Sequence, residues 1–435
     1  MNLLVTNTRN TQAYSIIRAL RPYAGKIVAT MEGDNRLAAR LSHAANSRLV
    51  DKRYYTPYPA DDWRSGKIQR ENTEKEESYI KAVLRICEAE KIDTIFPSFD
   101  PQIYVFSKNK SKFEKMGILI PIPDYDTAIV PLDKYRTILA AQEVGFPCPR
   151  TYLPERESDL AAIVADLCFP LVIKPRFTSG GRGTAIVRSS DELLAKMRQS
   201  WRNAPNGTMV QEYIPGTEKQ QFYLVLDKAG RLKMSFCPKT LRLFDRLYRN
   251  SSAASELSAP HPRSAQAGEV ARRLGWWGGL TLQTKVDPRD GLPKVLEANP
   301  RLGHHLWYRT GVAINEPLMC LRIAQGLDVA PIEDYPVGTM FLSPIEDALT
   351  FGSGLLDRCL YMFNARFSAN GNLDPLSVPP SLRELLRSYR QTYFSGKRKI
   401  FDPYFSHFFH DPAVSLLWWL KFSYQVVSSA KHLGR

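Results

Sequence analysis

A glycine-rich segment, LVIKPRFTSGGRGTAIV, carries the first side chains that could do chemistry. Lys174 stands at the end of an apolar run, and Gly180, Gly181 and Gly183 follow it. Glycines let a loop approach a ligand closely and present backbone N–H groups to phosphate oxygens. The segment is not a Walker A loop, because no Gly-Lys-Ser/Thr closes it and a strand, not a helix, follows. The pattern indicates either a phosphate-covering loop or a plain glycine-rich hairpin turn.

The segment VQEYIPGTE ends a second predicted strand in a Pro-Gly turn. Backbone groups from Gln211 to Ile214 and the carboxylate of Glu218 could meet an adenine edge and ribose hydroxyls. The same pattern is also typical of a turn with solvated acids. Both interpretations stay open at this point.

The segment LTLQTKVDPRDGLPKVLEANPRLG predicts a β-hairpin that reverses at Pro-Arg-Asp-Gly. Residues two apart share a strand face, so Glu297, Asn299 and Arg301 are expected on one face, and the hairpin can bring Gln283 across from them. Carboxylate and amide oxygens suit Mg²⁺, and a nearby arginine suits a phosphate oxygen. Burying these groups without a ligand would be costly. The alternative is a plain hairpin with exposed polar residues.

The elements that must position these motifs begin with an alternating α/β region. Apolar runs predict strands at 1–5, 26–30 and 93–97, and helical spacing predicts helices at 11–20, 35–43 and 76–90. This alternation implies a doubly wound parallel sheet, whose ligands lie beyond the carboxyl ends of the strands. No G-x-G-x-x-G follows the first strand, which argues against a dinucleotide site.

After a helix at 133–144 and the proline-rich stretch GFPCPRTYLP, the pattern becomes α+β with antiparallel hairpins. The segment QQFYLVLDKAGRLKMSFCPK predicts a hairpin that turns at 228–230. Further strands are predicted at 169–175, 184–190, 208–216, 279–286 and 293–301, and helices at 191–201, 264–274 and 316–325.

In this order and spacing, the three motifs resemble the ATP-grasp superfamily. The pattern is most similar to the ATP-binding half of the carbamoyl-phosphate synthase large subunit and to carboxylate–amine ligases. The lines LDKYRTILAAQEVGFPCPRTY and NPRLGHHLWYRTGVAINEPLMCLRIAQG add to the resemblance, which covers roughly 1–330. It implies a PreATP-grasp doubly wound domain at 1–130, a two-lobed ATP-grasp domain at 131–335, and a C-terminal aromatic-rich extension of unknown role at 336–435.

The resemblance assigns roles residue by residue. For ATP it implies Lys134, Lys174, Thr178, Ser179, Gly180, Gly181, Gly183, Gln211, Glu212, Tyr213, Ile214 and Glu218. For the metal it implies Gln283, Glu297 and Asn299. For catalysis it implies Arg301 at the phosphorylated intermediate, and Lys239 or nearby Arg242 at the γ-phosphate.

Two features depart from the family pattern. Many members have an acidic residue where Gln283 stands, although the carbamoyl-phosphate synthase pattern tolerates glutamine. The stretch LGHHLWYR is unusual, because a small or hydroxyl residue is common there. His304 and His305 are therefore candidates for substrate contact, with a structural role as the alternative.

The resemblance implies an ADP-forming ligase that activates a carboxylate as an acyl phosphate and joins it to an amine. ATP and Mg²⁺ are the implied cofactors, with Mn²⁺ as a substitute. The alternative is a catalytically degenerate nucleotide-binding protein with a regulatory or scaffold role, since fold does not fix function.

The composition leaves nucleic-acid binding unsupported. The chain has 435 residues and a formal net charge of +15, but the excess is spread along its whole length. Nucleic-acid modules concentrate their charge. The six cysteines are scattered without a C-x-x-C pair, and the N-terminus lacks the pattern of a signal peptide, so we expect a cytoplasmic protein.

The last hundred residues hold 17 of the 47 aromatic residues. The segment FDPYFSHFFHDPAVSLLWWLKFSYQVVSSAKHLGR combines these aromatics with sparse lysines. One interpretation is an amphipathic segment lying on a membrane interface, with Trp418 and Trp419 at headgroup depth. The other is a helix packed on the core or on a partner chain, which includes a homodimer.

Overall fold

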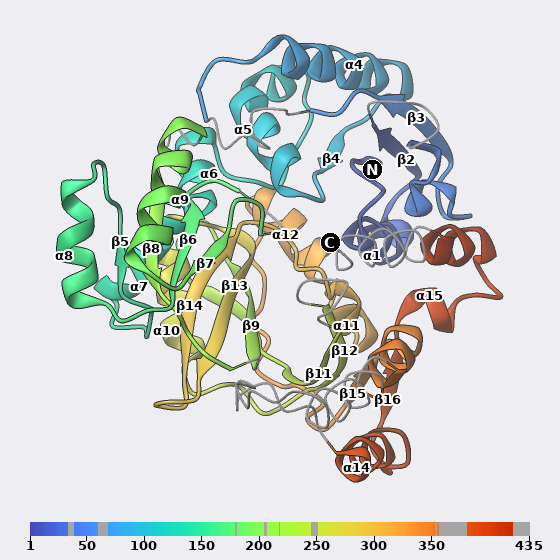
Figure 1. Cartoon of the computed structure of the whole chain (residues 1–435). Coiled ribbons are helices and arrows are strands. Elements are labelled where there is room, and N and C mark those ends of the chain that lie inside the picture. The colour runs from blue at the N-terminus through green and yellow to red at the C-terminus, as the bar shows by residue number, and fades with distance from the viewer. Residues whose placement is uncertain are drawn as a thin grey trace. The chain divides into compact units, whose positions relative to one another are not determined.

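We describe the protein from a computed structural model of the whole chain (Figure 1). The described residues are 1–33, 39–59, 68–178, 181–203, 207–216, 218–244, 251–352, 355 and 381–420. Residues 35–38 of the predicted helix at 35–43, Ser179 and Gly180, and the aromatic segment beyond 420 lie outside them. Two compact units make up the chain: Met1–Cys237 with Pro260–Asp334, and Pro238–Ala259 with Tyr335–Arg435. The domain boundaries at 130 and 335 stay a prediction.

The first unit begins with a parallel sheet whose strand order is β3-β2-β1-β4. Its strands are β1 (Asn2–Val5), β2 (Lys26–Glu32), β3 (Lys52–Thr56) and β4 (Thr94–Phe96). Leu3, Leu4 and Val5 of β1 are fully buried, as expected where both faces of a parallel sheet are covered. The predicted parallel sheet is confirmed, and β3 is a strand that the sequence patterns did not indicate.

Helices accompany this sheet: α1 (Thr11–Leu20), α4 (Glu74–Glu90), α5 (Asp100–Glu114) and α6 (Tyr125–Leu132), with 3₁₀ turns η1 (Arg21–Tyr23) and η2 (His43–Asn46). A capping box between Thr73 and Glu76 begins α4. β4 ends at Phe96, and a short loop of Pro97, Ser98 and Phe99 connects it to α5, which begins at Asp100. Pro101 stands in the first turn of α5, where its missing N–H costs nothing. Figure 1 shows α4 and α5 side by side.

Two antiparallel sheets follow in the first unit, with the orders β5-β8-β6-β7 and β10-β9-β13-β14. Their strands are β5 (Thr151–Tyr152), β6 (Leu171–Pro175), β7 (Ala185–Val187), β8 (Thr208–Glu212), β9 (Lys219–Leu226), β10 (Leu232–Phe236), β13 (Gly278–Asp287) and β14 (Leu292–Asn299). The helices are α7 (Lys134–Glu143), α8 (Ser158–Asp166), α9 (Ser190–Asn203), α10 (Ser264–Arg273), α11 (Leu306–Gly311) and α12 (Glu316–Ala324). The predicted β9–β10 and β13–β14 hairpins are confirmed.

A β-bulge in β14 determines which of its side chains lie in the hydrophobic core and which lie on a polar face of the sheet. Leu296 is an extra residue with no partner opposite it on β13. Val295 and Ala298 therefore both lie in the hydrophobic core, although they are three residues apart. Glu297 and Asn299 alternate with Ala298 and so point to the other face. Bulges re-aim side chains in this way.

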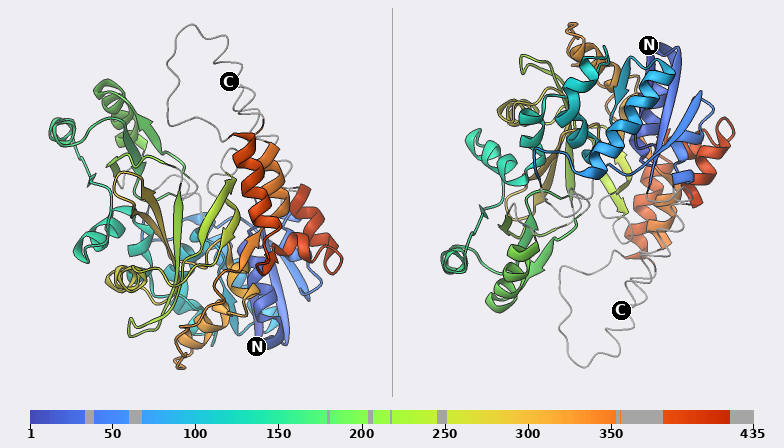
Figure 2. Two further views of the ribbon diagram at one scale, coloured as in Figure 1. Left: turned by 90° about the horizontal axis from the view of Figure 1, so that it is seen from below. Right: turned by 90° about the horizontal axis from the view of Figure 1, so that it is seen from above.

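The second unit has its own four-stranded sheet, of order β11-β12-β15-β16. Its elements are β11 (Lys239–Phe244), β12 (Ser251–Glu256), β15 (Met340–Leu342), β16 (Lys399–Phe401), α14 (Leu382–Tyr393) and α15 (Pro403–Ser406). In Figure 2 its C-terminal helices are drawn in orange and red.

The aromatic segment packs within this second unit. Trp418 is buried, and its ring stacks on Tyr404 with centroids 4.6 Å apart. Trp419 stacks on Phe408 at 5.1 Å. In the described part of the chain, no helix is both long enough and apolar enough to cross a bilayer. Contact with a membrane surface or a partner stays a prediction.

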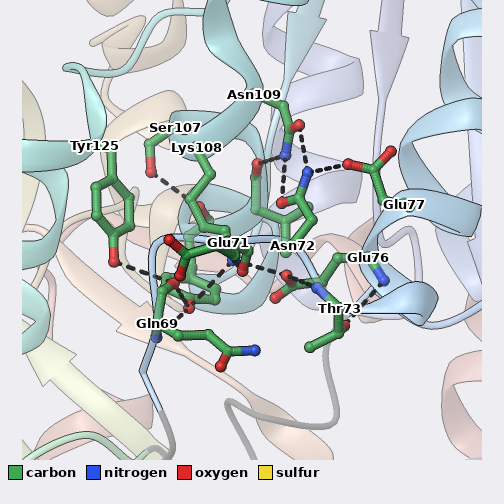
Figure 3. A network of polar contacts seen from close by, with 12 residues as sticks. Gln69, Glu71, Asn72, Thr73, Glu76, Glu77, Ser107, Lys108, Asn109 and Tyr125 are labelled. Atoms are coloured by element: carbon green, nitrogen blue, oxygen red, sulfur yellow. Dashed lines mark hydrogen bonds and ion pairs between the residues drawn. The ribbon is translucent and has the colours of Figure 1, made fainter.

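A buried polar network ties α4 to α5 (Figure 3). The ammonium of Lys108 donates to the Glu76 carboxylate at 2.7 Å and to the Glu71 carbonyl at 2.8 Å. The Lys108 side chain is 1% exposed and that of Glu76 is 0% exposed. Asn72 and Asn109 exchange amide hydrogen bonds of 2.7 and 3.0 Å. The loop before α4 is thereby fastened to α5.

We expect Lys108→Met to destabilise the protein by about 3 kcal/mol, because it leaves the Glu76 carboxylate buried without its counter-charge. Urea unfolding followed by circular dichroism measures this. The matched control is Lys112→Met, which removes a half-exposed pair with Glu77 and should cost less than about 1 kcal/mol. Equal losses in the two variants would contradict the prediction.

Candidate functional site

Two buried lysines face one carboxylate in the first unit. Lys134 begins α7 behind its N-cap Asp133, and Lys174 lies on β6. The Lys134 ammonium lies 3.7 Å from a carboxylate oxygen of Glu297 and donates to the Thr178 carbonyl. Burial lowers the pKa of Lys174 to about 8; Glu297 opposes this shift and Lys134 adds to it. Two ammonium groups near one carboxylate leave positive charge that an anionic ligand would neutralise.

Glu297 belongs to a polar face of the β10-β9-β13-β14 sheet. The register sets Gln221 of β9 opposite Gln283 of β13, and Gln283 opposite Glu297 of β14. The next row is Tyr223, Thr281 and Asn299. The hairpin thus brings Gln283 across from Glu297, as its sequence predicted. Sequence reasoning missed the β9 members, because only the pairing of β9 with β13 reveals them.

Arg301 joins this face to the end of the parallel sheet. Its guanidinium donates to the Asn299 side-chain oxygen at 3.0 Å and to the Asp100 carboxylate at 2.6 Å. The amide nitrogen of Asn299 is buried and has no hydrogen-bond partner among the described residues. The prediction that Arg301 shares a strand face with Glu297 was wrong, because β14 ends at Asn299. Arg301 instead lies in a bend after β14, and its guanidinium extends back to the Asn299 side chain.

The loop after β14 packs on the same polar face. A Cβ at Gly303 would lie 2.2 Å from a ring carbon of Tyr223, so the close approach requires glycine. His305 is buried 3.2 Å from the Tyr223 hydroxyl, and burial holds its pKa well below its ordinary value. His304 lies 2.9 Å from the hydroxyl of Thr11 at the start of α1. The structure gives His305 a packing role and places His304 against the N-terminal region.

The glycine-rich loop begins beside the lysines. The Thr178 carbonyl is the acceptor for Lys134. Gly181 and Gly183 both have φ of 69°, which side chains rarely adopt, and a Cβ at Gly183 would lie 2.8 Å from a ring carbon of Pro175. Glycine at these positions is therefore required by the turn itself, whether or not it covers a phosphate.

The predicted adenine-binding strand end has protein partners for its side chains. Gln211 donates to the Thr151 hydroxyl at 2.7 Å. Glu212 accepts from the Arg289 guanidinium at 2.6 Å and from the Arg150 backbone N–H at 3.2 Å. These side chains therefore hold β8 to its neighbours, and their assignment to adenine stays a prediction.

The turn after β8 is held by Lys285. Its ammonium donates to the Ile214 carbonyl at 2.6 Å and lies 5.2 Å from the centre of the Tyr213 ring. Glu218 is exposed, and its carbonyl accepts from the Val286 N–H at 3.0 Å. The exposed carboxylate is available to solvent or to a ligand such as a ribose.

The two candidates for the γ-phosphate lie in the second unit. Lys239 is exposed at the start of β11. Arg242 makes a buried ion pair with Asp347 and also donates to the hydroxyls of Ser388 and Thr392. The weaker assignment of Arg242 to a phosphate is not supported, because its guanidinium already binds within this unit. The role of Lys239 stays a prediction.

The polar face fits Mg²⁺ only together with phosphate oxygens. Within the described ranges, no three His, Cys, Asp or Glu side chains gather as a metal-holding group. The face offers one carboxylate, that of Glu297, with the amides of Gln283 and Asn299. Mg²⁺ is commonly held by one or two carboxylates, waters and substrate phosphates. The adjacent lysines would balance the charge of those phosphates.

Comparison with known protein families gives two matches. The family described as carbamoyl-phosphate synthase L chain, ATP binding domain, matches residues 133–330. The family described as PylC-like, N-terminal domain, matches residues 72–121. The carbamoyl phosphate synthase large chains of Myxococcus xanthus and Pseudomonas putida are 25% and 24% identical over 235 residues. Each match covers 51% of this chain but 22% of the relative.

Solved structures share the fold at low sequence identity. The biotin carboxylase of Campylobacter jejuni, in complex with β,γ-ATP, has a TM-score of 0.60 at 17% identity and covers 76% of this chain and 72% of its own. The biotin carboxylase domain dimer of Hydrogenobacter thermophilus 2-oxoglutarate carboxylase has a TM-score of 0.57 at 18% identity and covers 76% and 71%. That dimer was solved with MgADP, ADP and bicarbonate.

We expect Lys174→Met to raise the melting temperature of the ligand-free protein, since it replaces a desolvated cation with an apolar side chain of similar length. The same variant should lose the stabilisation that MgADP gives the parent protein. Thermal unfolding with and without MgADP measures both effects. Lys115→Met, at an exposed position, is the control and should change neither. A variant that keeps the full MgADP shift would remove Lys174 from the nucleotide site.

Proposed function

We propose that the protein is an ADP-forming ligase of the ATP-grasp superfamily. It activates a carboxylate as an acyl phosphate and joins it to an amine. The matched region is a minor part of the curated relatives' length, and the solved structures share only the fold. The substrates are therefore proposed by chemical class alone.

One observation carries the proposal. Lys134 and Lys174 are both more than nine-tenths buried, yet they approach the single carboxylate of Glu297. A protein that bound no anion would hold this charge at a cost in stability. A triphosphate supplies the missing negative charge, and its oxygens complete a Mg²⁺ site on the adjoining polar face.

The side chains divide the chemistry between them. Lys134 and Lys174 bind phosphate oxygens, while Gln283, Glu297 and Asn299 hold the metal. When bound, Mg²⁺ neutralises charge that develops on the transferred phosphoryl group. Arg301, which contacts Asn299 of this face, binds an oxygen of the phosphorylated substrate in this proposal.

The bond changes follow from this arrangement. A substrate carboxylate oxygen bonds to the γ-phosphorus, and the bond from that phosphorus to the bridging oxygen breaks, which releases ADP. The amine nitrogen then bonds to the acyl carbon and gives up a proton, and phosphate leaves with the acyl–oxygen electron pair. Positioning and electrostatics dominate such steps, so no nucleophilic side chain of the enzyme is needed.

The remaining proposals concern a substitute metal ion, the oligomeric state and an alternative function. Mn²⁺ is proposed as a substitute for Mg²⁺ because it accepts the same oxygen ligands. A homodimer is proposed by analogy with the biotin carboxylase domain dimer. A regulatory nucleotide-binding role is the alternative function, and tight ATP binding without turnover across a broad substrate screen would favour it.

The test is an ADP-release screen of the full chain with Mg²⁺, ATP and pairs of acids and amines. We expect release to require both substrates. Glu297→Ala should reduce it at least about 100-fold, as loss of a preorganised electrostatic group does. Glu114→Gln, an exposed acid on α5, is the control and should keep the parent rate. Undiminished turnover in Glu297→Ala would refute the metal-site assignment.

A further inference from the structure

The carboxyl edge of the parallel sheet holds a cluster of polar side chains that the phosphate site does not use. Glu32 ends β2, Asn7 and Asn10 follow β1, and Gln102 stands in the first turn of α5, directly after β4. Ligands of parallel sheets lie beyond the carboxyl ends of the strands. The cluster therefore lies where this fold places its ligands.

Glu32 has one carboxylate oxygen held by the protein and one left over. The held oxygen accepts from the Asn7 backbone N–H at 2.8 Å, the Thr30 hydroxyl at 2.6 Å and the Tyr79 hydroxyl at 3.4 Å. The other oxygen is buried and has no hydrogen-bond partner among the described residues. The residue is 3% exposed, and burial raises its pKa to about 7. An unmet buried acceptor of this kind is costly without a ligand.

Gln102 also has one side-chain atom held by the protein and one without a partner, but here the atom without a partner is a hydrogen-bond donor. Its side-chain oxygen accepts from the Asn7 amide at 3.2 Å, and that contact sets the orientation of the whole group. The amide nitrogen is buried without a partner in the described part of the chain, and so is that of Asn10. The cluster therefore presents one unmet carboxylate acceptor and two unmet amide donors.

Two polar contacts link this edge to the loop that follows β14. Asp100, two residues before Gln102, accepts from Arg301 at 2.6 Å. Thr11, next to Asn10, lies 2.9 Å from a ring nitrogen of His304. Residues next to the cluster in sequence thus contact Arg301, the residue proposed to bind the phosphorylated substrate, and His304.

We propose that this edge binds the amine substrate, as a small protonated amine that also carries hydroxyl, carbonyl or carboxylate oxygens. The ammonium group donates to the unmet oxygen of Glu32. The oxygens beside it accept from the amides of Gln102 and Asn10. An anion without an amine is disfavoured, because Glu32 would repel it. The assignment of the bound amine as a substrate rests on the proposed ligase function, whereas the binding site itself does not.

The test measures binding alone, by isothermal titration of the full chain without nucleotide. The probes are the standard amino acids, glycinamide, ethanolamine and spermidine, with acetamide and glycolate as amine-free counterparts. We expect at least one amine with oxygens near its nitrogen to bind, and its amine-free counterpart not to bind. Binding of the amine-free probes alone, or of none of the amines, would overturn the proposal.

Glu32→Gln is the informative variant. Its side-chain oxygen can keep the contacts to Asn7 and Thr30, while the unmet acceptor becomes an N–H donor that opposes an ammonium group. We expect the affinity for the amine to fall at least 10-fold, while Glu88→Gln, an exposed acid on α4, leaves it unchanged. Equal affinity in Glu32→Gln and the parent protein would overturn the site.

The MgADP-induced thermal shift separates this inference from the proposed function. In Glu32→Gln it should match that of the parent protein, which shows that the variant is folded and that the nucleotide site is intact. A parent protein that binds the amine through Glu32 but shows no MgADP shift would refute the ligase and leave the amine site standing. A parent protein that shows the MgADP shift but no amine binding that depends on Glu32 would refute the amine site and leave the proposed ligase function standing.

Discussion

The repulsion between two buried ammonium groups is the constraint on which the rest of the site depends. Lys134 enters from the first turn of α7, 3.7 Å from a carboxylate oxygen of Glu297, and Lys174 enters from β6, where the charge of the same carboxylate acts on its pKa. Like charges repel more strongly inside a protein than in water. The two lysines stay in place because each is carried by an element with its own packed core. In the proposed function, the cost in stability of these buried charges is offset by affinity for an anion, a trade that is common at functional sites.

The carboxylate of Glu297 is positioned by a β-bulge in β14. Without the extra residue Leu296, strict alternation would put Val295 and Glu297 on one face. The bulge sends Val295 into the core and leaves Glu297 beside Gln283. Gly303 then lets the following loop close over the same face. One strand thereby contributes both to folding and to chemistry.

Arg301 connects the polar face of β9, β13 and β14 to the helix that follows the parallel sheet. Arg301 and Asp100 are separated by 201 residues in sequence and by 2.6 Å in space. This ion pair joins Arg301, which follows β14, to the first residue of α5, the helix that follows β4 of the parallel sheet. The unmet acceptor of Glu32 lies at the carboxyl edge of that sheet. Activation of one substrate and capture of the other are thus assigned to adjoining surfaces of the same unit.

The sequence by itself determined the types of most elements and the pairing within the β13–β14 hairpin. Periodicity predicted the parallel sheet and the hairpins, and two-residue spacing with the cross-strand turn placed Gln283 opposite Glu297. Only the tertiary structure decided the long-range partners. These are the pairing of Gln221 with Gln283 and the contact of Arg301 with Asp100. It also decided which buried polar atoms at the edge of the parallel sheet have no hydrogen-bond partner among the described residues. The reason is physical. A local pattern encodes which face of an element is apolar, whereas partners far along the chain are chosen by register and burial summed over the whole fold.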